Sequence, residues 1–160
     1  MNWGKAFIAG VIGGAVMSIL LALARAMGMP ANLEVMQGTM LGLEPGATAW
    51  IVGFIMHLMI SGLIALVYAA GFEYVTHRAG WLVGVAFSIV HVLIGGIVMG
   101  MVPAMHPLIP EQMPAPGYFM AGMGMMGVIG FIMEHMIYGA IVGAIYSPVQ
   151  HDPARNEAVA

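Results

Sequence analysis

The decapeptide GFIMHLMISG, residues 53–62, returns with small changes as GFIMEHMIYG at residues 130–139. Each copy carries one histidine, His57 or His135, inside an otherwise apolar run. Similarity at a fixed interval is the sequence signature of a duplicated structural unit. The residues that recur 77 positions later include Gly53, Phe54, Ile55, Met56, Ile60 and Gly62. The sequence therefore predicts two equivalent helices that face each other.

The composition decides what surrounds these helices. The chain is 61% hydrophobic and 7% charged, whereas soluble domains are roughly 25% charged. Four stretches, about 5–27, 48–72, 81–102 and 125–146, reach the roughly 20 apolar residues that one helical membrane crossing needs. The sequence lacks the alternation of apolar and polar residues that would predict a β-barrel. Because an unpaired backbone is too costly in lipid, each of these stretches is predicted to form a helix. We expect an all-α integral membrane protein with four transmembrane helices.

The duplication also predicts how the four helices are organised. A single transmembrane domain, residues 1–146, would consist of two helical hairpins, about 4–72 and 80–146, each with a long link between its helices. Because each unit crosses the membrane twice, both copies begin on the same side, which makes the repeat parallel. Residues 147–160 are polar and rich in breakers, so we expect a short disordered cytoplasmic tail.

The few charges predict the orientation. Lys5, Arg78 and Arg155 lie at the termini and in the short middle link, whereas the long links 28–47 and 103–124 contain no lysine or arginine. The positive-inside rule then predicts that both termini lie on the cytoplasmic side of the membrane, which we expect to be a prokaryotic plasma membrane. Arg25, near the other end of the first helix, is the exception, and we expect its side chain to snorkel to the interface.

Three histidines and a carboxylate fall at one depth in the membrane. At a rise of about 1.5 Å per residue, His91 and His135 lie at the centres of their segments, with Met17 and Glu134 beside them and His57 close by. The histidines also share helix faces with small residues at a spacing of four, which pack helices together in lipid. Ionisable groups at this depth are costly and mark function. The alternative is that each histidine hydrogen-bonds a neighbouring helix and has a packing role.

The methionines indicate which ligand such a site would take. Twelve of the 18 lie in the long links or at the adjoining helix ends, and three Met-Gly-Met triplets occur there. Thioethers are soft ligands that select Cu(I), although methionine is also an adaptable apolar filler. Our leading hypothesis is a protein that binds or relays copper to a midplane site of His57, His91, His135, Glu134 and Met17. The predicted outer mouth comprises Met27, Met29, Met99, Met101, His106, Met123 and Met125.

Two other functions fit the same residues. His57 and His135 could be the axial ligands of a b-type haem in a four-helix bundle, with Gly62, Gly95 and Gly139 making room for the macrocycle. The protein could also be an accessory subunit of a larger membrane complex, or form a homo-oligomer. The sequence contains no G-x-S-x-G, phosphate-loop or H-E-x-x-H motif, so we predict no catalytic residue. We expect the protein to lie in the lipid bilayer and to bind no nucleic acid.

A family resemblance rests on these same residues. The patterns His57…Gly62…Tyr68 and His135…Gly139…Tyr146, with the opening segment WGKAFIAGVIGGAVMS at residues 3–18, resemble a widespread family of small, uncharacterised prokaryotic membrane proteins. The resemblance implies a four-helix membrane fold. It assigns no functional residue.

Overall fold

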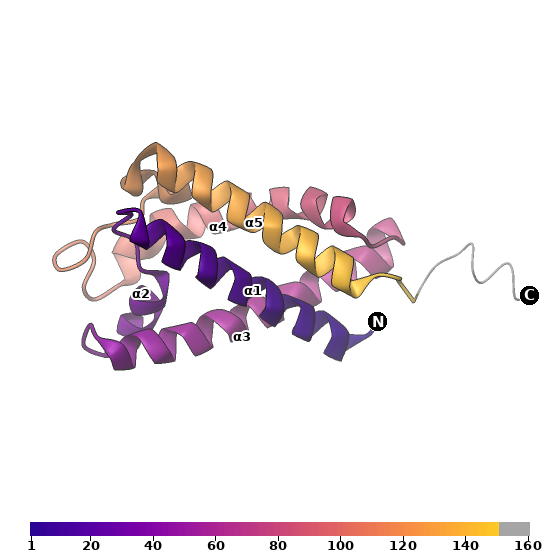
Figure 1. The fold of residues 1–160 in the computed structure, drawn as a ribbon, viewed down its shortest axis with the longest axis horizontal. Coiled ribbons are helices and arrows are strands. Elements are labelled where there is room, and N and C mark those ends of the chain that lie inside the picture. The colour runs from indigo at the N-terminus through magenta and orange to yellow at the C-terminus, as the bar shows by residue number, and fades with distance from the viewer. Residues whose placement is uncertain (151–160) are drawn as a thin grey trace, which may run out of the picture.

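The structure is a computed structural model that describes residues 1–150 and is helical and free of strands over that range (Figure 1). Residues 151–160, most of the predicted tail, lie outside the described residues. The four long helices are α1 (Trp3–Ala26), α3 (Ala47–Gly71), α4 (Trp81–Met105) and α5 (Gly124–Tyr146). Within residues 1–150 they and their extensions are the four helices long and apolar enough to cross a membrane. The predicted all-α fold and its four long apolar candidate spans are confirmed.

Three short elements complete the chain, namely α2 (Leu33–Met40), the π-helical turn η1 (Phe72–Thr76) and the 3₁₀ segment η2 (Tyr118–Met123). The third predicted span ends at about Val102, directly before Pro103. In the structure α4 continues to Met105, since a proline in the last turn forfeits one hydrogen bond and the His106 amide donates to the Val102 carbonyl at 2.9 Å. The first long link, for which the sequence predicts no helix, contains α2, which Asn32 caps by accepting from the Val35 amide at 3.1 Å.

Small residues bring the helix backbones together. α1 packs on α3 and α5, and α4 packs on α5. Gly84 of α4 lies so close to Gly139 of α5 that a Cβ at either position would overlap the carbonyl group of the other. Gly10 of α1 meets the Ser61 carbonyl of α3 in the same way. Lipid supplies no hydrophobic drive between helices, so this close approach holds the bundle together, as the small-residue spacing predicts.

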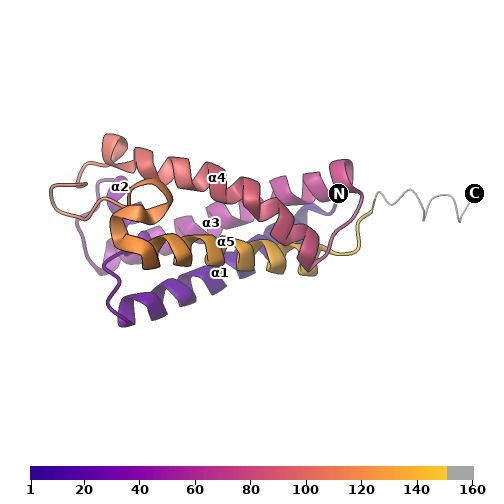
Figure 2. The same cartoon turned by 90° about the horizontal axis from the view of Figure 1, so that it is seen from above.

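The bundle is open along one side. In the described part of the chain α3 and α4 do not pack closely against each other, although they follow one another in sequence. Aromatic side chains join them near their short connection, where Phe87 of α4 contacts Tyr68 and Phe72. Towards the other end the two helices diverge, and α2 packs against α3 there (Figures 1 and 2). We call this arrangement the α3/α4 wedge and its wide end the α2 end.

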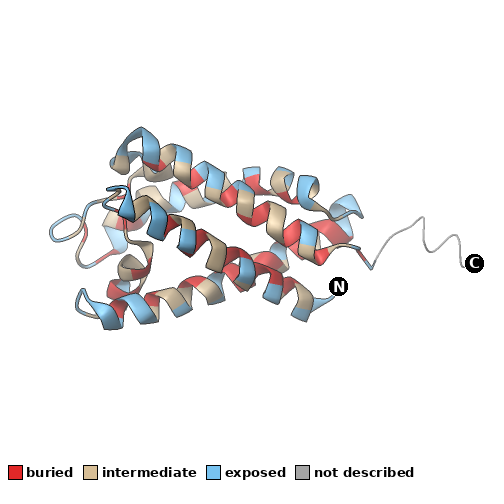
Figure 3. Cartoon of the chain, in the orientation of Figure 1, coloured by how far each residue is buried: buried red, intermediate tan, exposed pale blue. Residues whose placement is uncertain are grey.

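Towards the narrow end of the bundle the buried residues lie on the facing sides of the helices (Figure 3). A buried carboxylate closes this end. Glu73 of η1 is fully buried and accepts a hydrogen bond from the Tyr146 hydroxyl at 2.6 Å and bonds of 3.0 Å from the Gln150 amide to both carboxylate oxygens. The Asn2 amide in turn donates to the Tyr146 hydroxyl at 3.1 Å. Val149 is only 5% exposed. Residues 147–150, expected to begin a disordered tail, are therefore docked on the bundle, because a buried carboxylate requires donors.

The Gly84–Gly139 contact yields a test of the packing. Gly84→Ala should lower the free energy of unfolding by about 1–3 kcal/mol, because the new Cβ pushes α4 away from α5. Reversible denaturant unfolding in mixed micelles measures this. Gly130→Ala is the control, since the nearest atom to its added Cβ is Met29 Cε at 3.8 Å. Equal effects of the two substitutions would contradict the packing described here.

Candidate functional site

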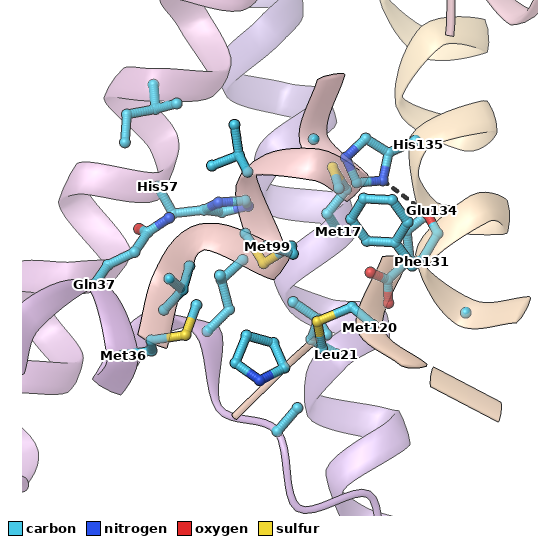
Figure 4. Close-up of a pocket in the computed structure, with 18 of the residues that line it drawn as sticks. Met17, Leu21, Met36, Gln37, His57, Met99, Met120, Phe131, Glu134 and His135 are labelled. Carbon is cyan, nitrogen blue, oxygen red and sulfur yellow. Dashed lines mark hydrogen bonds between the residues drawn. The ribbon is translucent and has the colours of Figure 1, made fainter. Parts of the chain in front are cut away.

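A cavity of about 580 Å³ lies inside the bundle, enclosed by α1, α3, α4 and α5 and covered at the α2 end by α2 and residues 113–123 (Figure 4). Its walls are mostly apolar. All five side chains that the sequence predicts at the membrane midplane line it: Met17, His57, His91, Glu134 and His135. The cavity is the candidate functional site.

His91 and His135 form a pair on one wall. Their ring centroids lie 4.5 Å apart with the ring planes at 76°. His135 Nδ1 lies 2.7 Å from the Phe131 carbonyl oxygen of its own helix, and because a carbonyl only accepts, Nδ1 carries the proton. In the neutral ring this leaves a lone pair on Nε2. His91 Nδ1 is hydrogen-bonded to the Tyr68 hydroxyl at 3.2 Å.

His57 stands apart from this pair. It projects from α3 on the opposite side of the cavity from His135 (Figure 4), and its Nε2 donates to the Gly14 carbonyl of α1 at 3.2 Å. Its Nδ1 then carries the lone pair in the neutral ring. Among residues 1–150 no three His, Asp or Glu side chains lie close enough together to hold one metal ion. The predicted cluster is therefore divided into a His91–His135 pair and a separate His57.

Glu134 adds a carboxylate to the same wall. It extends from α5 into the cavity (Figure 4) and makes no hydrogen bond with any side chain or backbone group of residues 1–150. The nearby arginine is already paired, because Arg25 Nη1 donates to Glu34 Oε2 at 2.9 Å. Glu34 is completely buried. Arg25, expected to snorkel to the interface, thus forms an ion pair with the first long link, which explains how a cation is accommodated at this end of α1.

Methionines form much of the lining, especially towards the α2 end. Each Met-Gly-Met triplet contributes one side chain to the cavity, namely Met29, Met99 or Met123. The other member of each triplet points outward: Met27, Met101 and Met125 are 81%, 49% and 73% exposed. In Met99–Met101, which lies within α4, residues two apart do not share a helix face, which accounts for the division there. The ten lining methionines are Met17, Met29, Met36, Met40, Met56, Met99, Met105, Met113, Met120 and Met123.

Some lining residues were not assigned to the site from the sequence. Met56 precedes His57, and Tyr138 follows His135 by three residues, a spacing that places two helical side chains on one face. The Tyr138 hydroxyl donates to the Ser61 carbonyl and so ties α5 to α3 beneath the cavity. Gln37 belongs to α2, which the sequence analysis did not identify. Its Oε1 is buried without a hydrogen-bond partner among the described residues.

His106, predicted to belong to the outer mouth, does not line the cavity. It is 5% exposed, and both ring nitrogens are occupied. Nδ1 accepts from the Leu108 amide at 3.1 Å, and Nε2 donates to the Met36 carbonyl at 2.9 Å and lies 3.1 Å from Thr39 Oγ1. His106 is therefore a clasp that joins the second long link to α2 over the cavity.

The glycines expected to make room for a haem are largely used in packing. Gly62 lies against the Phe7 ring, and Gly139 lies against Gly84. Gly95 alone of the three lines the cavity. The edge-to-face contact between His91 and His135 leaves no gap for a macrocycle between those two rings. His57 and His135 do lie across the cavity from each other (Figure 4).

Comparison with known proteins places the chain among relatives of unknown function. The model of the family of unknown function DUF6789 matches residues 1–157. This agrees with the resemblance to a family of small uncharacterised proteins. No curated protein and no solved structure matches the chain.

The clasp can be tested directly. His106→Ala should increase hydrogen–deuterium exchange in α2 and in residues 107–117, because the Leu108 amide and the Met36 carbonyl each lose their side-chain partner. The expected loss of stability is about 1–3 kcal/mol. Glu111→Ala, an exposed position in the same link, is the control and should leave exchange in α2 unchanged. Unaltered hydrogen–deuterium exchange in the His106 variant would show that His106 does not hold the second long link against α2.

Proposed function

We propose that this chain, which belongs to the DUF6789 family of unknown function, binds or relays a soft transition metal, Cu(I) foremost, across a prokaryotic plasma membrane. In this proposal the termini face the cytoplasm, as the positive-inside distribution indicates, and the α2 end faces outward. The hairpins α1–α3 and α4–α5 are the two copies of the repeat. Supporting the common side of the termini, Asn2 and Gln150 both reach the Tyr146–Glu73 contact.

The observation that carries this proposal is the lining of one continuous cavity. Thioethers from Met29, Met36 and Met99 line this cavity together with three imidazoles. Figure 4 shows Met36 on the same side as His57. Methionine sulfur selects Cu(I) over hard divalent ions, and imidazole also binds copper. Because the chain contains no cysteine, thioether is the soft ligand that this cavity offers.

The His91–His135 pair, with Met17, is the proposed resting site. His135 donates one ring N–H to a backbone carbonyl and keeps the lone pair on the other nitrogen, which is the arrangement that orients metal-ligating histidines. His57 has the same arrangement through Gly14 and provides a second station on the opposite wall. Glu134 has no hydrogen-bond partner among the described residues and is placed to act as a carboxylate ligand or a proton acceptor.

A b-type haem is the second candidate, favoured by the position of His57 and His135 on opposite walls of the cavity (Figure 4). The two proposals separate on protein purified gently from its native membrane. Stoichiometric copper by elemental analysis supports the relay. Iron with a Soret band supports the haem. If the purified protein contains neither copper nor haem but is accompanied by stoichiometric partner proteins, the accessory-subunit hypothesis would replace both proposals.

The triplet Met99-Gly100-Met101 offers a matched pair of variants for the metal proposal. Met99→Leu should weaken Cu(I) binding several-fold, and His135→Ala should weaken it at least about tenfold, or about 1.4 kcal/mol. Met101→Leu should leave binding unchanged, because Met101 points away from the cavity. Anaerobic competition with a chromogenic Cu(I) chelator in detergent gives these affinities. Equal effects at Met99 and Met101 would mean that the cavity is not the path of the metal.

A further inference from the structure

The α3/α4 wedge opens the cavity sideways. The helices pack in the order α3, α1, α5, α4, and within residues 1–150 no close backbone packing joins the first of these to the last. The aromatic contacts of Phe87 close only the narrow end. Towards the α2 end, α2 covers the wedge. An opening therefore remains between α3 and α4 at the level of the hydrocarbon core.

The rim of this opening is aliphatic. Val67 of α3 and Val90, Ile94 and Val98 of α4 line the cavity and are also 71%, 57%, 59% and 43% exposed on the outside of the bundle. A side chain that is both cavity-lining and exposed must lie where the cavity meets its surroundings. Around these two spans the surroundings are lipid tails, so the opening admits lipid-soluble molecules and carries no polar barrier.

The polar atoms left over inside the cavity are mainly hydrogen-bond acceptors. His135 donates through Nδ1 and His57 through Nε2, so the other nitrogen of each neutral ring accepts. No Lys or Arg side chain of residues 1–150 lines the cavity, since Arg25 is bound to Glu34 elsewhere. A phosphate or carboxylate headgroup would therefore meet no cation. A neutral hydroxyl would meet acceptors it can donate to.

We propose that the cavity binds a lipid-soluble alcohol, which enters from the bilayer through the α3/α4 wedge and donates its hydroxyl to the acceptor nitrogen of His57 or His135. The volume of about 580 Å³ lies within the range of roughly 300–1,000 Å³ typical of small-molecule sites. The apolar body of the ligand occupies the methionine-rich walls, which adapt to irregular shapes. The alcohol proposal uses the same cavity and two of the same histidines as the metal proposal, but it requires neither a metal nor a change in oxidation state.

Farnesol and farnesyl methyl ether are a suitable pair of probes, because they share one apolar body and only the alcohol can donate a hydrogen bond. Metal-free protein in nanodiscs is loaded with tritiated farnesol and challenged with each unlabelled compound. Farnesol should compete about tenfold better than the ether, as expected for one hydrogen bond to a buried acceptor. In the double variant His57→Leu with His135→Leu this ratio should fall to about one. No specific binding of farnesol, or a ratio retained in a folded double variant, would overturn the proposal.

The route is tested separately with two substitutions on α4. Ile94→Trp places an indole at the rim and should slow farnesol association at least tenfold. Ile97→Trp should not, because Ile97 is similarly exposed, 51% against 59% for Ile94, but does not line the cavity. Gel filtration and thermal stability in detergent verify that both variants fold. Identical association rates in the two would exclude the wedge as the route. Copper stoichiometry of the same variants, measured before the metal is removed for the farnesol assay, is an independent readout. Failure of this proposal therefore leaves the metal proposal unaffected, and the reverse also holds.

Discussion

The contact between Gly84 and Gly139, where the backbones of α4 and α5 meet without an intervening side chain, determines the shape of the rest of the molecule. Helices in lipid are held together by packing and hydrogen bonds, with no gain from leaving water. α1 and α3 are joined by the equivalent contact of Gly10 with Ser61. No such contact joins α3 to α4 in the described residues, so they separate and a cavity remains between them.

The polar groups of this cavity are held in fixed orientations. The carbonyls of Gly14 and Phe131 each take one imidazole proton, and the Tyr138 hydroxyl bonds the Ser61 carbonyl. Each bond satisfies a group whose burial would otherwise be costly. The second ring nitrogens of His57 and His135 make no such bond within residues 1–150, and both residues line the cavity. The metal proposal and the alcohol proposal both depend on these two nitrogens.

Much of the fold follows from the sequence because membrane helices obey few rules. Apolar length defines the four spans, and small residues at a spacing of four identify the packed faces of α1 and α4. Depth along a helix correctly brings His91 to His135. The rotation of each helix about its axis could not be predicted, because tertiary packing sets it. This rotation separates His57 from the His91–His135 pair and directs Met99 into the cavity and Met101 away from it. α2 was missed because its eight residues are too few for hydropathy to reveal, although the capping residue Asn32 was visible.

The clamp around Glu73 links the beginning of the chain to its end. Asn2 contacts the Tyr146 hydroxyl, and Glu73 receives that hydroxyl and the Gln150 amide. During synthesis the first helix emerges long before these partners exist. The N-terminal residues therefore reach their final position only after the last helix has been inserted. A nascent chain that stops before Tyr146 lacks this closure, and the contact therefore forms only when all four long helices are present.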